Sequence, residues 1–172
     1  MAELPSLLVN FRVYNDSNDV IGVVDVELPK LEAMTETLKG AGVAGEINMP
    51  VIGHYASMET KLNFRTVDKD AIIISATKGQ KLDIRGAQEV FDKSANEIKV
   101  VPVKLIVKGM PKSTELGKFE MGAGTDSSLT LETMYLKLTI DGETKAEIDK
   151  MNYIATINGT DYLDDVRKAL GL

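Results

Sequence analysis

The 172-residue sequence predicts a mainly β protein that folds as a single domain, residues 1–172. Three observations predict this class. Several segments alternate apolar and polar residues or are rich in β-branched residues, as strands are. Asp141-Gly142 and Asn158-Gly159 are dipeptides typical of tight turns between paired strands. No low-complexity linker or internal repeat divides the chain, and its length suits one domain with a sizeable core.

The first half of the chain predicts strands, and one segment in it favours a helix. Residues 31–39 indicate a short helix or an irregular extended piece. Residues 70–78 favour a helix capped by Asp68 or Asp70 and stopped by Gly79. A buried strand is the alternative there, because isoleucines at 72–74 are β-branched. The predicted strands are 7–14, 20–28 and 55–66, the first two forming a hairpin with a turn at 15–19.

The second half predicts longer strands and a terminal helix. Residues 81–93 are ambiguous, and residues 110–126 predict a loop rich in glycine, serine and threonine. Pro102 marks a sheet edge or a bulge, since proline lacks the backbone N–H that a strand donates. Thr160 or Asp161 caps a predicted helix over 161–170. The predicted strands are 97–108, 127–140 and 143–157.

Composition excludes several classes of function. The net charge of −6 argues against a protein that grips nucleic acid, because such proteins neutralise phosphates with Lys and Arg. The net charge does not exclude nucleic acid that passes close to the protein without being bound. The absence of cysteine excludes disulfides, thiolate metal sites and thiol nucleophiles. No apolar run approaches 18 residues, and an acid at Glu3 without a basic n-region makes a poor signal peptide.

Three glycines, Gly40, Gly42 and Gly45, have the G-x-G-x-x-G spacing of dinucleotide-binding loops. That site needs a strand before the glycines, a helix directly after them and an acid about 20 residues further on. Pro50 and Gly53 would interrupt such a helix, and no alternating β-α-β pattern follows. The simpler interpretation is a backbone that turns or closely approaches another chain.

No other motif predicts chemistry. His54 is the only histidine, which limits a catalytic triad or a histidine metal site to one imidazole. The acidic clusters lack the frame of a calcium loop and are typical of a solvated surface. We therefore predict no catalytic residue, cofactor site or metal site, and no enzyme.

The C-terminal segment 138–172 resembles the end of the major tail tube protein of contractile-tailed phages and R-type bacteriocins. The N-terminal half matches this family at Asn15-Asp16, at Gly22-Val23, at the LPKL of 28–31 and at the glycine cluster of 40–45. The resemblance covers nearly the whole chain and is weakest at 79–96. The C-terminal match is carried by Leu138, Thr139, Asp141, Gly142, Glu147, Ile148, Asp149, Asn152, Ile154, Asn158, Gly159, Asp161, Leu163, Arg167, Gly171 and Leu172.

The resemblance implies a fold and a structural role. It implies a β-sandwich or barrel-like tail tube fold with a flanking helix and a short C-terminal helix. Six subunits would form a ring, and rings would stack into a hollow tube inside a contractile sheath. The tube would be driven through a cell envelope and conduct DNA or ions. The implied partners are the sheath, baseplate and tail terminator proteins, with DNA as passing cargo and no stable membrane insertion. The implied location is a virion or bacteriocin tail assembled in the bacterial cytoplasm.

Three groups of residues are predicted to serve this assembly. Gly40, Gly42 and Gly45 form an extended connector between subunits. Arg167, Gly171 and Leu172 contact a neighbour or the sheath. The candidates for facing the lumen, where polar and acidic side chains should alternate, are Glu59, Thr60, Lys61, Glu132 and Lys137.

Two alternatives remain beside the tube subunit. One is a monomeric β-sandwich that works as a binding module. The other is a nucleotide-dependent enzyme that uses Gly40–Gly45, which the strand-rich pattern disfavours.

Overall fold

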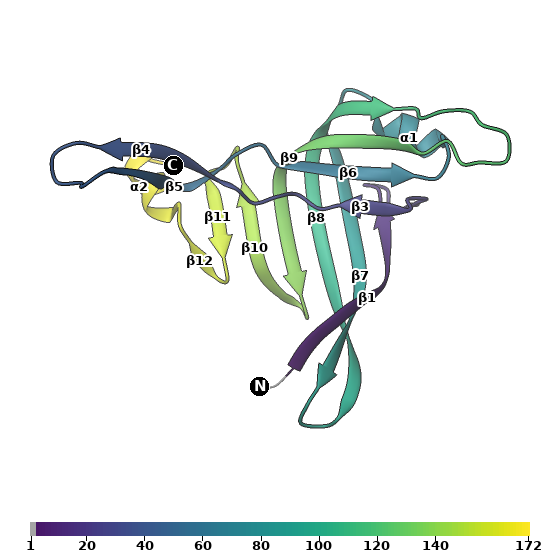
Figure 1. The fold of residues 1–172 in the computed structure, drawn as a ribbon, viewed down its shortest axis with the longest axis horizontal. Helices are drawn as coiled ribbons and strands as arrows, with labels where there is room; N and C mark the ends of the chain where they lie inside the picture. The colour runs from purple at the N-terminus through teal and green to yellow at the C-terminus, as the bar shows by residue number, and fades with distance from the viewer. Residues whose placement is uncertain (1–2) are drawn as a thin grey trace.

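A computed structural model describes residues 3–172 and has an extended, three-armed outline (Figure 1). Twelve strands and two short helices form the described chain. The strands are β1 Glu3–Tyr14, β2 Val20–Ile21, β3 Asp25–Glu27, β4 Ala33–Lys39, β5 Glu46–Tyr55, β6 Glu59–Phe64, β7 Gln80–Asp92, β8 Glu97–Glu115, β9 Ser127–Ile140, β10 Glu143–Asp149, β11 Ile154–Ile157 and β12 Thr160–Asp161. The helices are α1 Lys69–Ile74 and α2 Asp164–Leu170.

Ten strands form one bent sheet. Its main path runs β12-β11-β10-β9-β8-β7-β1-β2, and neighbouring strands are antiparallel. One edge of β9 is divided between two partners. Its first half, residues 127–132, pairs with β6, while residues 135–140 pair with β10. The sheet therefore splits near Met134 into two layers.

We call these layers the large sheet and the small sheet. The large sheet comprises β1, β2, β7, β10, β11 and β12 with the facing parts of β8 and β9. The small sheet comprises β3 and β6 with the C-terminal part of β8 and the N-terminal part of β9. In Figure 1 the two layers run in different directions, and β8 and β9 bend from one into the other.

The hydrophobic core lies between the two layers. The large sheet contributes Val13, Leu82, Leu105 and Leu136, among others, and the small sheet contributes a second set from β6 and β9. Alternate residues on each strand point to the core, as the two-residue period of a strand requires. That second set is Leu62, Phe64, Leu129 and Leu131.

Both helices are short. Asp68 caps α1 as predicted, its carboxylate accepting the Lys69 N–H, and α1 buries Ala71 and Ile74 in the core. The helix ends at Ile74 rather than continuing to Gly79. The predicted cap of α2 is wrong: the helix starts at Asp164, and its N-cap, Leu163, makes no side-chain capping bond. Within residues 3–172, neither helix is long and apolar enough to span a membrane.

The predicted hairpin turns are confirmed. Asp141 and Gly142 have φ values of 51° and 78° and join β9 to β10. Asn158 and Gly159, at 48° and 84°, join β11 to β12. Positive φ at both central residues matches the right-handed twist of the strands they connect. Strand 127–140 is also found with the predicted bounds.

Other predicted elements differ from the structure. Residues 31–39 form neither the short helix nor the irregular extended piece that were the alternatives, because they contain the regular strand β4. The predicted strand 20–28 is broken into β2 and β3. The predicted loop 110–126 is wrong in its first part, because β8 continues to Glu115 through a register shift between Pro111 and Ser113. The pairing of β8 with β9 begins at Val103. Pro102 lies just outside this pairing, at an edge as predicted.

Candidate assembly surfaces

The hairpin formed by β4 and β5 is a two-stranded sheet whose residues are almost all exposed. One of its faces is mainly apolar, with Glu36 opposite Met49 as a charged residue on it. Leu38 lies opposite Ile47, and Met49 and Val51 follow at alternate positions on the same side. These four side chains are 38–49% exposed. The opposite face is polar, with Thr37 hydrogen-bonded to Asn48 and Lys39 paired with Glu46.

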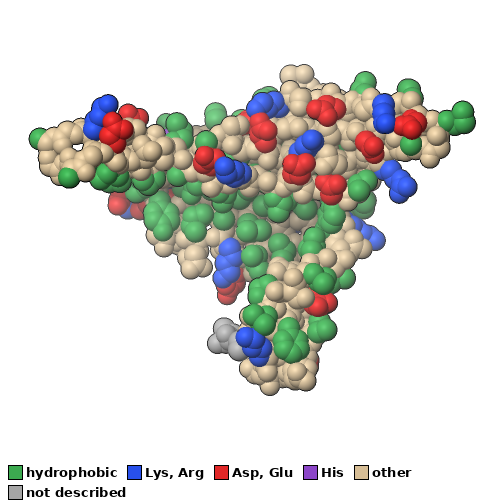
Figure 2. Space-filling view, viewed as in Figure 1, with side chains coloured by type: hydrophobic (Ala, Val, Ile, Leu, Met, Phe, Trp, Pro, Cys, Tyr) green, Lys and Arg blue, Asp and Glu red, His purple; other side chains and the backbone are tan. Residues whose placement is uncertain are grey.

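An isolated two-stranded hairpin is marginally stable in water at best. An amphipathic hairpin whose apolar face has no cover within its own chain therefore indicates a surface that packs on another molecule. Figure 2 shows hydrophobic side chains gathered along the lower edge of the arm that carries β4 and β5.

Gly40, Gly42 and Gly45 form the tip of this hairpin. Their φ values are 133°, 94° and 129°, a region that side chains with a Cβ rarely adopt. No atom of the chain lies within 4 Å of a Cβ built at any of the three, so crowding inside the subunit is not the reason for glycine. The predicted extended connector is wrong in geometry, because the segment reverses the chain. A role between subunits stays a prediction.

The same turn removes the nucleotide-binding interpretation. Strand β5 follows Gly45 directly, where a dinucleotide site needs the N-terminus of a helix to hold the phosphates. His54 is exposed, and its Nδ1 lies 2.7 Å from the carbonyl oxygen of Ile52. Within residues 3–172, no three acidic or histidine side chains lie close enough together to hold a metal ion.

Two further apolar surfaces project from the body. A second arm consists of the N-terminal part of β1 with the end of β7 and the start of β8 (Figure 1). The third surface is the loop after β8, where the side chains of Phe119 and Met121 are 94% and 101% exposed. The exposed apolar residues of the second arm are Leu4, Leu7, Leu8, Val9, Ile98 and Val100.

The outward face of the small sheet contains three of the five residues predicted to face a lumen. Glu59 lies opposite Glu132, and Lys61 lies opposite both Glu27 and Thr130. Lys112 forms ion pairs with Glu59 and Glu132 and so joins β8 to this face. The strands of this face carry five carboxylates against two lysines: Asp25, Glu27, Glu59, Glu115 and Glu132 with Lys61 and Lys112.

The structure separates the other two residues from this face. Thr60 is 0% exposed, and its hydroxyl is 2.7 Å from that of Thr133 inside the protein. The prediction for Thr60 is therefore wrong, since a fully buried side chain cannot face a channel. Lys137 lies on the large sheet instead, where its Nζ is 3.4 Å from Glu147.

The C-terminal helix is fastened to its own subunit by Arg167. The guanidinium donates to the Tyr153 carbonyl and to the Asp161 carboxylate, both at 2.6 Å. The hydrogen bond from Arg167 holds the pKa of Asp161 below its ordinary value. Arg167 is thus engaged inside the chain, while Gly171 and Leu172 remain exposed. The predicted contact of these three residues with a neighbour or the sheath stays a prediction.

Replacing Arg167 by alanine is expected to lower the free energy of unfolding at pH 7, because the hydrogen bonds to Tyr153 and Asp161 are lost. The Asp161 pKa is depressed in the folded protein, so this contribution is present above the unfolded pKa of about 3.9. It is lost as the pH falls through the folded pKa. Urea titrations from pH 7 to pH 2.5 should show the two curves converging below about pH 4. Lys168→Ala removes an exposed pair with Asp164 and serves as the matched control. A difference between Arg167→Ala and wild type that is constant with pH would contradict this account.

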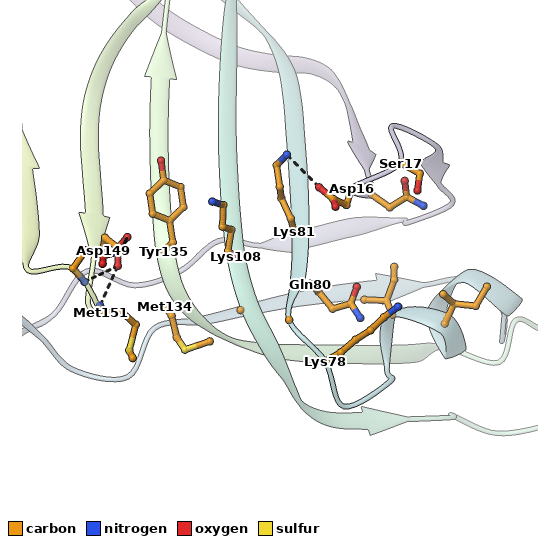
Figure 3. Close-up of a pocket in the computed structure, with 16 residues that line it drawn as sticks. Asp16, Ser17, Lys78, Gln80, Lys81, Lys108, Met134, Tyr135, Asp149 and Met151 are labelled. Atoms are coloured by element: carbon orange, nitrogen blue, oxygen red, sulfur yellow. Dashed lines mark hydrogen bonds and ion pairs between the residues drawn. The ribbon is translucent and has the colours of Figure 1, made fainter.

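A groove of about 830 Å³ lies where the large sheet meets α1 and the loop before β2. Figure 3 shows Lys81, Lys108 and Tyr135 side by side on β7, β8 and β9, with Asp149 beside them. Burial and the hydrogen bond to Glu147 raise the pKa of Tyr135 to about 12, so its hydroxyl stays protonated at neutral pH.

The sequence prediction missed the apolar face of the β4–β5 arm. The sequence does contain a signal for this face. Apolar residues stand at every second position, at Ile47, Met49 and Val51, and Leu38 lies opposite Ile47. The prediction also missed a row of cations on the large sheet. Arg12 lies opposite Arg85, and Arg85 lies opposite Lys104, because strand pairing brings together residues that are far apart in the chain.

Comparison with known proteins identifies the family. The family model "Phage tail tube protein FII" matches residues 5–171. The chain is 29% identical to the tail tube protein of Escherichia phage P2, over 98% of this chain and 99% of that one. It is 24% identical to the major tail tube protein of Serratia phage KSP20, over 98% of both chains.

Two solved structures share the fold. One is the sheath/tube terminator of the PVC extracellular contractile injection system in the extended state, with 16% identity and a TM-score of 0.54 over 79% of this chain and 97% of that one. The other is the sheath-tube complex of the same system, with 16% identity and a TM-score of 0.50 over 75% of this chain and 87% of that one. The predicted tail tube fold is thereby confirmed, and the chain belongs to the phage tail tube protein FII family.

Proposed function

We propose that this protein is the subunit of the inner tube of a contractile tail. Six copies form a ring, rings stack into a hollow tube, and sheath contraction drives the tube through the target envelope. The tube then conducts DNA in a phage or ions in a bacteriocin. The role is structural and not catalytic, as in the tail tube proteins to which the chain is similar.

The observation that carries this proposal is the β4–β5 arm with its uncovered apolar face. A subunit that works alone gains nothing from an exposed surface that promotes association. We take a second copy of this chain to be the molecule that packs on the apolar face, because a repeated subunit presents complementary surfaces at every position of a closed ring. The second apolar arm and the loop with Phe119 supply further surfaces for contacts around the ring and between rings.

The sheath protein is the proposed partner outside the tube, with baseplate and tail terminator proteins at its ends. The related folds come from a sheath-tube complex and a sheath/tube terminator, which supports these partners. The subunit is expected in the tail of the mature particle after assembly in the cytoplasm of the bacterial host.

Electron microscopy of the purified protein tests the proposal directly. Hollow tubes or six-membered rings in negative stain are the expected result. Because assembly depends on concentration, the sample is examined over a range from micromolar upward. A monodisperse monomer at every concentration would contradict the proposal and favour a β-sandwich that binds a ligand on its own.

We further propose that the outward face of the small sheet lines the channel. Its excess of carboxylates repels DNA phosphates over about 8 Å at physiological salt, so DNA passes without being held. Replacing Asp25 and Glu27 by lysine is expected to slow DNA ejection from a phage about tenfold or more at low salt. Ejection is measured by dye fluorescence in particles whose tubes look normal.

The control replaces the exposed acids Glu143 and Asp165 by lysine, which changes the net charge equally at sites away from the small sheet. Because screening weakens the attraction, added salt should restore ejection through the Asp25/Glu27 variant. Unchanged ejection in that variant, or equal slowing in the control, would rule out a repulsive channel face.

A further inference from the structure

We infer that Leu163 is a positioning residue for the β4–β5 arm. Its side chain lies against Gly53 at the base of the arm and sets the angle at which the arm leaves the body. This positioning follows from contacts within one subunit. Its consequence for tube assembly rests on the proposed function, in which the apolar face of the arm packs on a second copy.

Strand β5 is irregular at the base of the arm. Ala33 of β4 pairs with Tyr55, and the next pair along the arm is Thr35 with Pro50. A single residue of β4 therefore faces residues 51–54 of β5, and we call this segment of β5 the elbow. Extra residues in one strand of a pair bend that strand, so the direction of the arm is decided at the elbow.

Gly53 lies in the elbow and touches the C-terminal segment. Its φ of 65° is a left-handed conformation that favours glycine. Space requires glycine as well, because a Cβ at this position would lie 2.4 Å from Cγ and 2.5 Å from Cδ2 of Leu163. The leucine side chain thus fills the volume that any other residue at position 53 would need. Helix α2 begins directly after Leu163, at the base of the arm (Figure 1).

Hydrogen bonds fix Leu163 to the body. The residue is 3% exposed, and its backbone N–H donates to the carboxylate of Asp161 at 3.0 Å. The same carboxylate accepts the hydrogen bond from Arg167. Tyr162 donates its backbone N–H to the carbonyl of Ala155 on β11 at 2.9 Å. Because these bonds fasten the backbone at Leu163 to the end of the large sheet, a side chain at position 53 that collides with the leucine displaces the elbow.

The chain is also tied to the body directly after the elbow. Lys150 donates to the carbonyl of Ala56 at 2.7 Å, and Ala56 donates its N–H to the carbonyl of Glu32 at 2.8 Å, which joins the two ends of the arm. Within residues 3–172, β4 and β5 pair only with each other. The remaining freedom of the arm is rotation about its two joined ends, and the contact between Gly53 and Leu163 limits that rotation.

A cavity of about 190 Å³ beside this contact gives the elbow room to move. Gly53 and Leu163 line it together with Ile148 and Ile154 of the large sheet. Removing the leucine side chain would enlarge the cavity, so the elbow would no longer have one fixed seat. Strand β4 has seven residues and is about 23 Å long, so a rotation of roughly 15° at the elbow moves the tip of the arm by about 6 Å. In a ring that repeats one interface, such a displacement recurs at every junction.

The test measures the position of the arm as the distance between two spin labels on dilute, unassembled protein. The chain has no cysteine, so labels attach only to cysteines introduced at the exposed Lys39, at the tip of the arm, and Glu143, at the start of β10. Pulsed electron paramagnetic resonance should give one narrow distance in the otherwise unchanged chain. We expect Gly53→Ala to shift this distance by about 5 Å or more, and Leu163→Ala to broaden its distribution. Adding Leu163→Ala to Gly53→Ala should remove most of the shift, because the new methyl group then meets no leucine.

Two controls separate positioning from general damage. Gly122→Ala places alanine at a φ of 80° with no atom within 4 Å of its Cβ, so it imposes backbone strain without crowding. Leu105→Ala removes a buried leucine of β8. Neither control should change the label distance. Circular dichroism verifies that each variant is folded, and if Leu163→Ala is not, the shift in Gly53→Ala decides the test.

An unchanged label distance in Gly53→Ala would overturn the inference, as would a shift that persists in the folded double variant or an equal shift in either control. Tube formation is then measured by negative-stain microscopy on the same variants without labels, and Gly53→Ala is expected to give about tenfold fewer tubes. Normal tubes from a variant whose arm has moved would contradict the role of the arm in assembly, while the positioning by Leu163 would stand. If the wild type forms no tubes, the proposed function fails, and the label distances still test the positioning.

Discussion

Gly109→Ala is expected to lower the free energy of unfolding by at least about 2 kcal/mol, a large share of the roughly 5–15 kcal/mol typical of a domain. Gly109 lies at the bend where β8 passes from the large sheet into the small sheet. There Lys108 pairs with Tyr135 and Gly109 with Thr133, so Met134 is an extra residue on β9. This bulge brings the two backbones together: a Cβ on Gly109 would lie 2.2 Å from the carbonyl oxygen of Glu132.

Backbone atoms of two paired strands cannot move aside as a flexible side chain can, so the added methyl group must distort the bend itself. Urea denaturation of dilute protein, followed by circular dichroism, measures the effect. Gly79→Ala is the matched control, because no atom lies within 4 Å of a Cβ at Gly79, and a change within about 1 kcal/mol is expected there. Equal stability of the two variants would mean that the bend does not depend on close contact at Gly109.

Local sequence signals predicted the turns, the strand and the helix cap that depend only on residues close together in the chain. Asp141-Gly142 and Asn158-Gly159 adopt positive φ at low cost, so they predict hairpins whatever surrounds them. The alternation in 127–140 predicts a strand with one buried face, and that strand is found. Of the two predicted caps, Asp68 and Asp70, Asp68 is the cap in the structure; a carboxylate that accepts a backbone N–H needs only its own neighbours in the chain.

The missed parts depend on contacts between distant segments. Thr60 lies between Glu59 and Lys61 on one strand, so the two-residue period of a strand turns its side chain to the opposite face from theirs. It is buried because Thr133, 73 residues away, satisfies its hydroxyl. The cations at 12, 85 and 104 are unremarkable in sequence and become a row only through strand register. Residues 31–39 lack a strong strand signal because β4 packs on no core within its own subunit.

The hairpin β4–β5 allows assembly to be separated from folding. Replacing Leu38 by lysine and Ile47 by glutamate removes two apolar side chains that lie opposite each other on the exposed face. The new side chains can form a cross-strand ion pair, which maintains the hairpin, and the net charge of the chain does not change. Because both sites are about half exposed, the free energy of unfolding of the subunit should change by less than about 1 kcal/mol.

Tube formation by this variant is expected to be lost. Each subunit repeats the interface, so a buried ion pair that replaces apolar contact weakens every junction of the tube at once. The matched control is Thr37→Lys with Asn48→Glu, an adjacent pair on the polar face of the same hairpin, whose tubes should form as in wild type. Sedimentation velocity and negative-stain microscopy measure assembly, and urea denaturation measures folding. Normal tubes from the Leu38/Ile47 variant would show that the apolar face of the arm is not an interface. Loss of tubes in both variants would show instead that either face of the arm is buried on assembly, as when the arm is enclosed between two neighbouring subunits.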